Sequence, residues 1–436
     1  MANVYKMYPN PAQERVMIRH CGEARFIYNL CLEQFNYYWK GSNPPDFNDR
    51  SLQLTELRKE LPWLREGSAS IQQQAINNFN NGCVNWWKGT HGRPKFKKRY
   101  DKDSFCIRDV KVEKLNKKWM QISVPKVGYV KFKLSRALPK NYGMAHVSRT
   151  KAGEWRVSFT AEPEAILREP TGKAIGIDRG VITTLATSDK QFLRIPQMSK
   201  RDQERLLKLE QQFSRQSKHA TQVIKKLKDG EPKPFFVNKE KTRKKIAKLQ
   251  GKYVARRRDW IEKQTTHLVI ENDIIAAEKL MIQNMTKAPK PKLAEDGKTY
   301  LPNGAAAKAG LNKAILSQCW GLFLQRLQQK ATLADVTVVL VDPKHSSQEC
   351  RKCHYIHSDN RKSQAEFECV NCHYKNHADA NAADIIIARG LEILETAQAE
   401  GQPGLCPRKS IQRTAVETPI GKLTSKEVTL MGIPLL

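Results

Sequence analysis

Four cysteines near the end of the sequence constrain its folding more than any other feature. Cys350 and Cys353 form one Cys-x2-Cys pair, and Cys369 and Cys372 form a second pair after fifteen intervening residues. Four thiolates at this spacing are typical of a zinc ribbon, whose closed tetrahedral site leaves no position for water. We therefore predict a structural zinc site. Three histidines beside it are expected to lie outside the ligand set or in solvent: His354, His357 and His373.

The other six cysteines are scattered along the chain, which favours a reducing compartment over a secreted disulfide framework. No apolar run approaches the ~20 residues that a membrane span needs. The amino-terminal segment MANVYKMYPNPAQ also lacks the apolar core of a signal peptide. We expect a soluble prokaryotic protein of the cytoplasm that does not bind membranes.

The length and charge of the chain indicate several domains and a polyanionic partner. A chain of 436 residues exceeds one ordinary domain, and 40% hydrophobic residues exclude a wholly disordered protein. Lys and Arg number 76 against 44 Asp and Glu, giving a net charge of +32. Such a charge opposes a compact state unless a polyanion neutralises it, and nucleic acid is the obvious partner. Composition alone leaves a ribosome-like basic protein open.

Hydrophobic periodicity predicts helices in the first part of the chain and strands in the next. Residues 3–8 alternate as a strand does, and residues 12–90 place apolar side chains at helical spacings of three and four. Residues 105–165 hold short alternating segments between Asn, Pro and Gly breaks, which predict a small antiparallel barrel or sheet. Residues 3–8 can complete that sheet.

The rest of the chain mixes strands with helices. Residues 173–189 predict a buried strand, a tight turn at Arg179-Gly180 and a second strand. Long charged helices follow in 198–266. Within 201–260, Lys and Arg number 19 against 7 Asp and Glu, which favours a polyanion track over a merely solvated face. The remaining predictions are a strand in 273–280, a mobile loop in 286–304, one amphipathic helix in 307–334, a strand covered on both faces in 336–342 and a final helix in 378–400.

Three acidic residues stand where this order of elements can bring them together. Asp178 ends the strand AIGID, Glu278 ends the strand IIAAE, and Asp379 lies at the start of the last helix. A carboxylate that follows four apolar residues is costly to bury without a cation. Oxygen ligands favour Mg²⁺, and two metal ions ~3.5–4 Å apart are a common arrangement for phosphodiester cleavage. Asp379 taken alone could simply cap a helix.

Aromatic side chains alternate with cations just before the predicted strands. Such a mixture is typical of surfaces that stack bases and follow a phosphate backbone, although a solvated basic loop has the same composition. The aromatic residues are Trp86, Trp87, Phe96 and Tyr100, and the cations are Lys88, Arg93, Lys95, Lys97, Lys98 and Arg99.

Several segments share their order and spacing with a known family. They are DIIAAEKL, AGLNKAIL, VDPKHSSQECRKC, DNRKSQAEFECVNC and NHADANAADIIIARG, together with YPNPAQ, ARFIYN, GRPKFKKR, WRVSF and GIDRGV. With them the chain resembles the TnpB/OrfB family of transposon-encoded RNA-guided DNA nucleases, relatives of compact type V CRISPR effectors. The resemblance covers nearly the whole chain except its tail.

The resemblance implies a multidomain α/β protein with an added β-barrel. The amino-terminal parts are a wedge-like β-barrel in 1–10 and 105–168 and a helical recognition domain in 11–104. A RuvC-like nuclease domain of RNase H fold follows in 169–344 and 375–400, and it includes a basic helical hairpin in 198–266. A zinc ribbon is inserted in 345–374, and we expect the tail in 401–436 to be disordered.

The resemblance also implies an RNA-guided, Mg²⁺-dependent DNA endonuclease of a transposable element. Asp178, Glu278 and Asp379 match its three catalytic metal ligands. Guide RNA and double-stranded target DNA are the implied partners of a chain that we expect to be monomeric and to act at the nucleoid. The candidates for reading a short DNA motif beside the target are Gln72, Gln73, Asn77 and Lys95, for which an ordinary polar helix face is the alternative. Further candidate nucleic-acid contacts are Trp87, Lys97, Lys98 and Arg99.

The sequence departs from the family pattern at two places, and two other functions stay open. Lys279 follows the second acid, and the last helix starts His377-Ala378-Asp379, but neither change removes a ligand. One alternative is an RNA-guided DNA-binding repressor that does not cut. The other is a DDE-type transposase, which normally ends its acid series with Glu and needs a DNA-end recognition domain. No helix-turn-helix pattern is evident, and the series here ends with Asp379.

Overall fold

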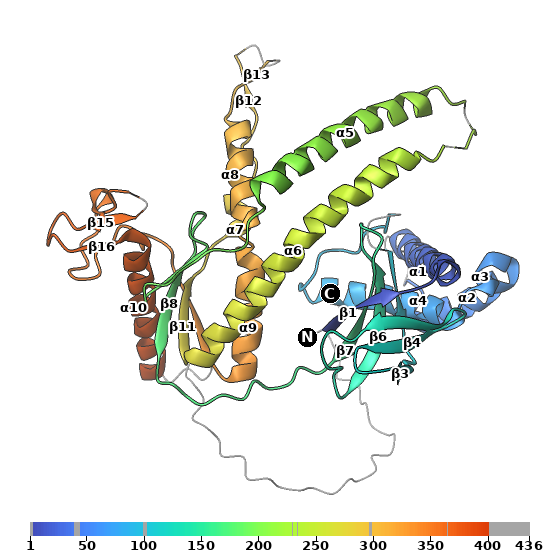
Figure 1. Ribbon diagram of the computed structural model, residues 1–436, viewed down its shortest axis with the longest axis horizontal. Helices are drawn as coiled ribbons and strands as arrows, with labels where there is room; N and C mark the ends of the chain where they lie inside the picture. Colours follow the sequence, from blue (N-terminus) through green and yellow to red (C-terminus); the bar gives the residue numbers. More distant parts are fainter. Residues whose placement is uncertain are drawn as a thin grey trace, which may run out of the picture.

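The computed structural model describes residues 3–400 except 39–43, 99–102, 229, 233, 296–298 and 364. The candidate contact Arg99 and the predicted tail in 401–436 lie outside these residues. Within them the chain forms two main β-sheets, each with its own helices, and a long helical hairpin that projects from the second sheet (Figure 1). None of the described helices combines the length and apolar character needed to cross a bilayer.

The described residues before 99 confirm the predicted helical region. The helices are Pro11–Tyr38 (α1), Phe47–Glu60 (α2), Pro62–Glu66 (α3) and Ala69–Trp87 (α4). Asn10 and Gln13 start α1, because each side-chain oxygen accepts a hydrogen bond from the main-chain N–H of the other residue. Helices α1 and α4 then pack through Phe35 and Phe79, whose ring centroids lie 5.9 Å apart.

The first sheet has the order β2-β6-β7-β1-β5-β4-β3 in the described part of the chain, with antiparallel pairing throughout. Its strands are Asn3–Tyr8 (β1), Asp103–Ile107 (β2), Val112–Lys114 (β3), Trp119–Val124 (β4), Gly128–Lys133 (β5), Tyr142–Arg149 (β6) and Trp155–Ala161 (β7). Strand β1 lies between β5 and β7, so the prediction that residues 3–8 complete this sheet is confirmed.

The first sheet does not close into the predicted barrel. Its edge strands β2 and β3 do not pair with each other among the described residues, so the sheet is an open half-barrel. Helices take the place of closing strands, because Met17 of α1 and Phe79 of α4 share one buried core with Phe105, Phe132 and Phe159 of the sheet. The predicted recognition and wedge parts therefore have a common hydrophobic core.

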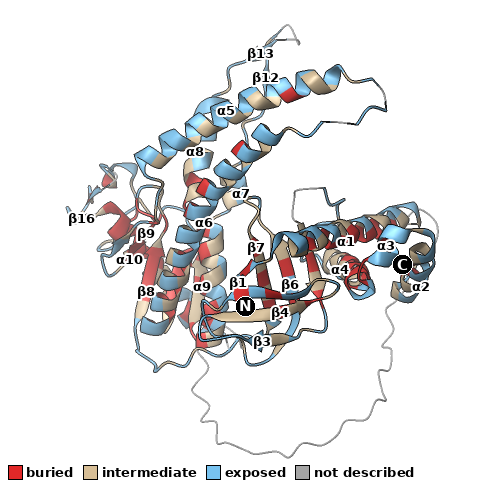
Figure 2. Cartoon of the chain, turned by 45° about the vertical axis from the view of Figure 1, so that its right-hand side comes forward, coloured by how far each residue is buried: buried red, intermediate tan, exposed pale blue. Residues whose placement is uncertain are grey.

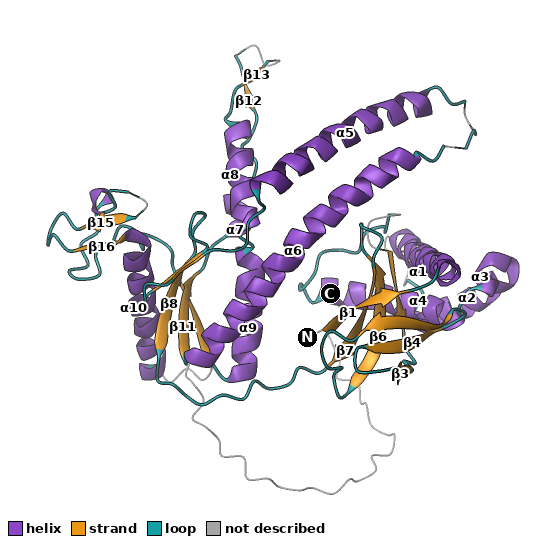
Figure 3. Ribbon diagram, in the orientation of Figure 1, coloured by secondary structure: helices purple, strands orange, loops and turns teal. Residues whose placement is uncertain are grey.

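The second sheet has the order β10-β9-β8-β11-β14 within the described residues. Figure 3 shows its strands β8 and β11 beside α10. Its strands are Ala174–Asp178 (β8), Leu185–Thr187 (β9), Phe192–Leu193 (β10), Ile274–Glu278 (β11) and Thr337–Val341 (β14). Strands β8, β11 and β14 run parallel, whereas β9 is antiparallel to both β8 and β10.

Helices cover both faces of the second sheet, as the apolar strand in 336–342 predicts. Figure 1 shows α6 (Val237–Glu271) and α9 (Trp320–Ala334) on one side and α10 (Ala378–Ala399) on the other. Successive strand residues face opposite helices. Ile177 lies in the core with α6 and α9, whereas Ala276 and Val339 lie in the core with α10.

Two glycines let α10 lie directly against the sheet. A Cβ added to Gly176 of β8 would lie 2.1 Å from the main-chain oxygen of Ala383 in α10. A Cβ added to Gly390 of α10 would lie 2.6 Å from the Cβ of Ala276 in β11. The absence of these two side chains sets the height of α10 above the strands, and with it the position of the first turn of α10.

The charged hairpin predicted in 198–266 is confirmed. It consists of α5 (Lys200–Lys225) and α6, which continues beyond the predicted end to Glu271 and reaches the sheet. Figure 2 shows that the surface of α5 is largely exposed, and Ala220 is its buried residue. This exposure leaves the cations of the hairpin available to a partner.

Two predictions for residues 286–334 are wrong in detail. The single helix expected in 307–334 is divided into α8 (Ala305–Ser317) and α9, because Cys319 adopts a left-handed conformation with φ of 56°. Gln318 at this break bonds to the main-chain oxygen of Val181 and to the hydroxyl of Thr184. The predicted loop in 286–304 contains a two-stranded ribbon. The small elements here are Ile282–Met285 (α7), Lys292–Leu293 (β12) and Tyr300–Leu301 (β13).

We predict that Gly176→Ala destabilises the chain by more than ~2 kcal/mol, because the new methyl group meets main-chain atoms that cannot rotate away. The measurement is the melting temperature in differential scanning fluorimetry. Gly251→Ala is the matched control, since a Cβ at this position of α6 meets no atom within 4 Å. The control should gain up to ~1 kcal/mol from helix propensity. Equal melting temperatures for the two variants would contradict the close approach of α10.

Candidate functional site

The first two candidate acids lie at the same edge of the second sheet. Ile177 of β8 is the register partner of Ala277 of β11, so Asp178 and Glu278 follow at matching positions on adjacent parallel strands. Because side chains alternate along a strand, both acids leave the sheet on the side opposite Ile177, which is the side covered by α10. Glu278 is 6% exposed, and Asp178 is half-buried.

The third acid, Asp379, lies in the first turn of α10 and is 3% exposed. It does not cap the helix. The N-cap is His377, whose Nδ1 accepts a hydrogen bond from the main-chain N–H of Asp379. The Asp379 carboxylate is therefore free of the capping role, and its Oδ1 forms an ion pair of 2.8 Å with Nη2 of Arg361.

The three acids interact electrostatically. Burial, together with the negative charges of Glu278 and Asp379, raises the pKa of Asp178 to about 7. Burial also raises the pKa of Glu278, although a hydrogen bond of 2.6 Å from the hydroxyl of Ser346 opposes the rise. The structure thus brings together three carboxyl groups from segments about a hundred residues apart in the sequence, and their mutual repulsion favours a cation among them.

Two arginines that the sequence analysis did not select lie beside these acids. Arg179 is 5% exposed and donates from Nη2 to the main-chain oxygen of Glu278, so it joins the ends of β8 and β11. Arg361 reaches Asp379 from the segment that contains the cysteines. A cation directly after the strand AIGID was a visible signal for Arg179. No sequence signal indicated Arg361, because it lies 18 residues from its partner Asp379.

The four cysteines form a compact metal-binding group. Their sulfur atoms all lie within 4.8 Å of one another, and among the described residues no other set of three or more His, Cys, Asp or Glu side chains meets this spacing. The acids described above are therefore more widely spaced than the cysteines. A tetrahedral zinc ion requires four close thiolates, so this donor set fits zinc.

The two cysteine pairs have the same pattern of main-chain hydrogen bonds. In the first half Cys350 N–H donates to the oxygen of Tyr355 and His354 N–H to that of Cys350; in the second half Cys369 and His373 donate in the same way to Tyr374 and Cys369. Both histidines have positive φ, which closes each turn around its two sulfurs. Neither they nor His357 belong to the metal-binding group, as predicted. The small elements here are Ser358–Asn360 (η1, a 3-10 helix), Glu366–Glu368 (β15) and Lys375–His377 (β16).

The cysteine group is tied to the acid-bearing helix by hydrogen bonds. Asn381 of α10 is fully buried, donates to the main-chain oxygen of Glu349 and accepts from the N–H of Arg351. Together with the pair between Arg361 and Asp379, these bonds fix the cysteine-containing segment against the first turns of α10. Folding of that segment therefore supports the position of Asp379.

The structure buries one of the candidate nucleic-acid contacts, Gln72. Gln72 is 0% exposed, and its amide bonds to Glu23, to Arg58 and to the main-chain oxygen of Leu64. The polar helix face expected from SASIQQQAINN is thus divided, because Gln72 points into the packed helices while Gln73 is exposed and Asn77 half-buried.

The aromatic and basic candidates lie at the surface, but they differ in how firmly neighbouring residues hold their side chains. Trp87 is 57% exposed, although its ring also lies 6.3 Å from that of Phe35. Lys95 and Lys98 are exposed. Lys97 is held more firmly, since its Nζ lies 3.6 Å from the ring centroid of Tyr28 and its main chain exchanges two hydrogen bonds with Asn29.

Comparisons with known proteins agree over most of the chain. Family models of the OrfB_IS605 group match residues 2–43 ("Helix-turn-helix domain") and 158–288 ("Probable transposase"), and one described as "Cas12f1-like, TNB domain" matches 320–386. The InsQ protein of Escherichia coli (strain K12), named "Putative RNA-guided DNA endonuclease InsQ", is 28% identical over 94% of this chain and 98% of its own length. The matching family domains and this relative support a TnpB-like family for the chain.

One further curated protein and one solved structure also match the chain. A protein of Streptomyces pristinaespiralis with the name "Putative RNA-guided DNA endonuclease" is 27% identical over 94% of this chain and 93% of that protein. A chain in the cryo-EM structure of the Cas12f1-sgRNA-target DNA complex is 14% identical, with a TM-score of 0.46, and the match covers 86% of this chain and 82% of that one.

The family match to residues 2–43 differs from one expectation. The sequence shows no evident helix-turn-helix pattern, yet a model described as a helix-turn-helix domain matches this segment. In the structure, the described residues of the segment form strand β1 and the continuous helix α1. A single uninterrupted helical periodicity contains no turn signal, which is why the match was not foreseen.

We predict that the purified TnpB-like chain carries tightly bound zinc, and that Cys350→Ser lowers the yield of folded protein because metal binding contributes to folding. Zinc is measured by mass spectrometry of the metal content, and folding by gel filtration. Cys319→Ser is the control, since Cys319 lies outside the metal-binding group. A stable, zinc-free wild-type chain would refute this assignment.

We also predict that Asp178→Asn stabilises the metal-free chain, and more so at pH 8 than at pH 5. The raised pKa of Asp178 means that its contribution to stability is lost as the pH rises from about 4 towards 7. The gain should therefore be ~1–2 kcal/mol larger at pH 8, measured by thermal unfolding in EDTA. Asp342→Asn, at the exposed end of β14, is the control and should show no such difference. A gain for Asp178→Asn that is the same at both pH values would contradict the raised pKa.

Proposed function

We propose that this chain is an RNA-guided DNA endonuclease. The observation that carries the proposal is the electrostatic convergence of Asp178, Glu278 and Asp379 at one edge of the second sheet. Both relatives that align over most of the chain bear the name of such an enzyme. The net charge of +32 supports a nucleic-acid partner, because a phosphate backbone would neutralise it.

We infer that the second sheet and α10 form a RuvC-like nuclease core of the RNase H type. Two features support this inference: an antiparallel set, β8 to β10, followed by the parallel strands β11 and β14, and a final helix that carries the third acid. Asp178, Glu278 and Asp379 would hold Mg²⁺, which when bound supplies Lewis-acid activation of water for phosphodiester hydrolysis. The carboxylate donor set fits such a hard cation.

The surrounding residues have separate tasks in this proposal. Ser346 orients Glu278 through its hydrogen bond, and Arg179 holds the ends of β8 and β11 together. Arg361 keeps Asp379 in place from the zinc ribbon. The hairpin of α5 and α6 would bind RNA and the RNA–DNA duplex through the phosphate backbone, while base pairing supplies sequence specificity.

The two other functions have specific disadvantages. An RNA-guided repressor that does not cut would have no need of three buried or half-buried acids, whose burial and mutual repulsion raise the pKa of Asp178. A DDE-type transposase would normally end its acid series with Glu, whereas the residue on α10 is Asp379. The match to a helix-turn-helix model is the feature that favours the transposase.

We predict that Asp178→Ala abolishes cleavage of target DNA and leaves the binding of RNA and target near the wild-type level, because the substitution removes a proposed metal ligand and no basic surface. The assay is plasmid cleavage with the RNA that copurifies with the chain, in Mg²⁺ or EDTA. Asp342→Ala is the matched control, because Asp342 also follows a parallel strand but is exposed. Cleavage that persists in Asp178→Ala would show that the site is elsewhere. Guided binding without cleavage by the wild type would favour the repressor.

A further inference from the structure

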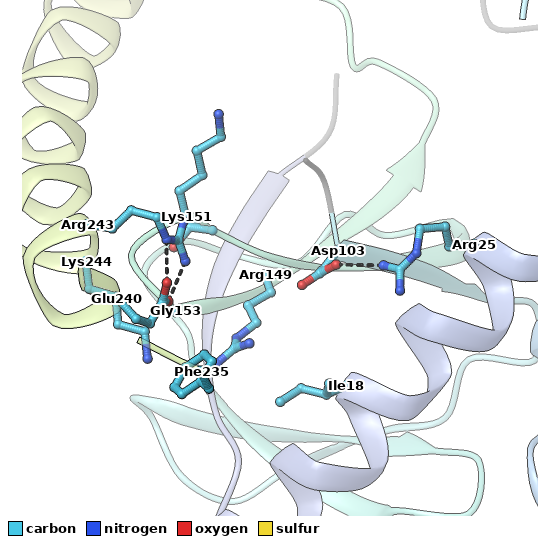
Figure 4. A pocket seen from close by; sticks show the side chains of 11 residues that line it. Ile18, Arg25, Asp103, Arg149, Lys151, Gly153, Phe235, Glu240, Arg243 and Lys244 are labelled. Atoms are coloured by element: carbon cyan, nitrogen blue, oxygen red, sulfur yellow. Dashed lines mark hydrogen bonds and ion pairs between the residues drawn. The ribbon is translucent and has the colours of Figure 1, made fainter. Parts of the chain in front are cut away.

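A cavity of about 290 Å³ lies between the first sheet and the start of α6 (Figure 4). Four segments that are distant in the sequence line it. Ile18 and Arg25 come from α1, and Asp103 comes from β2. The other lining residues lie in 149–153, at the turn between β6 and β7, and in 235–244, at the entry into α6. The cavity is thus a meeting point of the helical part, the sheet and the basic hairpin, and it lies apart from the acids and the cysteines.

The cavity has an excess of positive charge. Its lining contains five cations and two acids: Arg25, Arg149, Lys151, Arg243 and Lys244 against Asp103 and Glu240. Ion pairs neutralise most of these charges, because Arg25 pairs with Asp103 at 3.2 Å, Arg243 with Glu240 at 2.6 Å, and Arg149 with Glu14 at 2.9 Å. In the described part of the chain Lys151 and Lys244 form no ion pair and are exposed, so the surplus charge belongs to them.

The backbone brings these cations to one wall. Gly153, with φ of +86°, turns the chain between β6 and β7, and a Cβ there would lie 3.9 Å from Nη2 of Arg149 and 4.0 Å from Cε of Lys244. The pKa of Glu240 is lowered mainly by its hydrogen bond from Arg243, and the charges of Lys244 and Arg149 lower it further. The cations of the sheet and of α6 therefore contribute positive charge to the same cavity.

Two further features suit a phosphodiester. Nε of Arg149 is buried and has no hydrogen-bond partner within the described residues, so a donor remains for an anionic oxygen. At the rim, Phe235 is 68% exposed and Ile18 is 38% exposed, and these apolar side chains could pack against a sugar or a base.

We propose that this cavity binds a phosphodiester group of a nucleic-acid backbone, and that the bound phosphate joins the start of α6 to the first sheet. The inference rests on the proposed function, which supplies nucleic acid as the partner. A phosphate accepts charge-assisted hydrogen bonds from several cations at once. It would bridge Lys151 and Arg149 of the sheet to Lys244 of the hairpin, so that nucleic-acid binding orders the hairpin.

The test compares two double variants with equal changes of charge. Lys151→Gln with Lys244→Gln removes the surplus cations of the cavity. Lys117→Gln with Lys140→Gln removes two exposed lysines in loops of the first sheet, neither of which lines the cavity. We expect the first variant to bind a labelled RNA hairpin about tenfold more weakly than the wild type, with a smaller salt dependence, and the second to change little. Fluorescence anisotropy provides both measurements.

Hydrogen exchange tests the bridging role. Adding the RNA hairpin, or a DNA hairpin of the same sequence, should protect the amides of residues 237–244 in the wild type and in the control variant but not in the cavity variant. Whichever nucleic acid, RNA or DNA, protects these amides better is the source of the bound phosphate. Protection by inorganic phosphate alone, equal weakening of both variants, or no binding by the wild type would overturn the proposal. If Asp178→Ala still cuts while the cavity variant loses binding, the assignment of the catalytic acids fails and the cavity assignment stands.

Discussion

Helix α10 lies on β8 with no side chain between them, because Gly176 leaves room for the main-chain oxygen of Ala383. This close contact fixes the first turn of α10 above the carboxyl ends of the parallel strands. Asp379 is thereby brought to the edge where Asp178 and Glu278 end β8 and β11. A larger residue at position 176 would lift the helix and move the third carboxylate away from the other two.

Gathering three carboxylates in this way costs free energy, since burial and like charges both oppose ionisation. The raised pKa of Asp178 reflects that cost. Nearby cations and hydrogen-bond donors offset part of this cost. Arg179 donates to the main-chain oxygen of Glu278, and Ser346 donates to the Glu278 carboxylate. Arg361 forms an ion pair with Asp379. The segment with the four cysteines is inserted in the sequence between β14 and α10, so a metal held by those cysteines would also support Arg361 and Asn381 beside the acids.

The predictions that succeeded depended on local periodicity, and those that failed depended on partners distant in the sequence. The strands ending at Asp178 and Glu278 were found because four apolar residues precede each acid. Gln72 was placed at the surface because its neighbours are polar, but Glu23 and Arg58 supply buried partners for its amide. The helix break at Cys319 was missed because Gln318 is held by Val181 and Thr184, which no local pattern reveals. The strand pattern left a barrel or an open sheet, and the family resemblance implied a barrel, whereas helices α1 and α4 occupy the open side of the sheet.

The sequence by itself determined the identity of the reactive groups: two Cys-x2-Cys pairs, acids at the ends of apolar strands, and a basic helical hairpin. These are properties of residue type and spacing, which act over a few turns or strand positions. The tertiary structure alone decided that Arg179 and Arg361 flank the acids, that the half-barrel stays open, and that Lys151 and Lys244 face one cavity. Such contacts join residues tens to hundreds of positions apart, so they exist only after packing has chosen which surfaces meet.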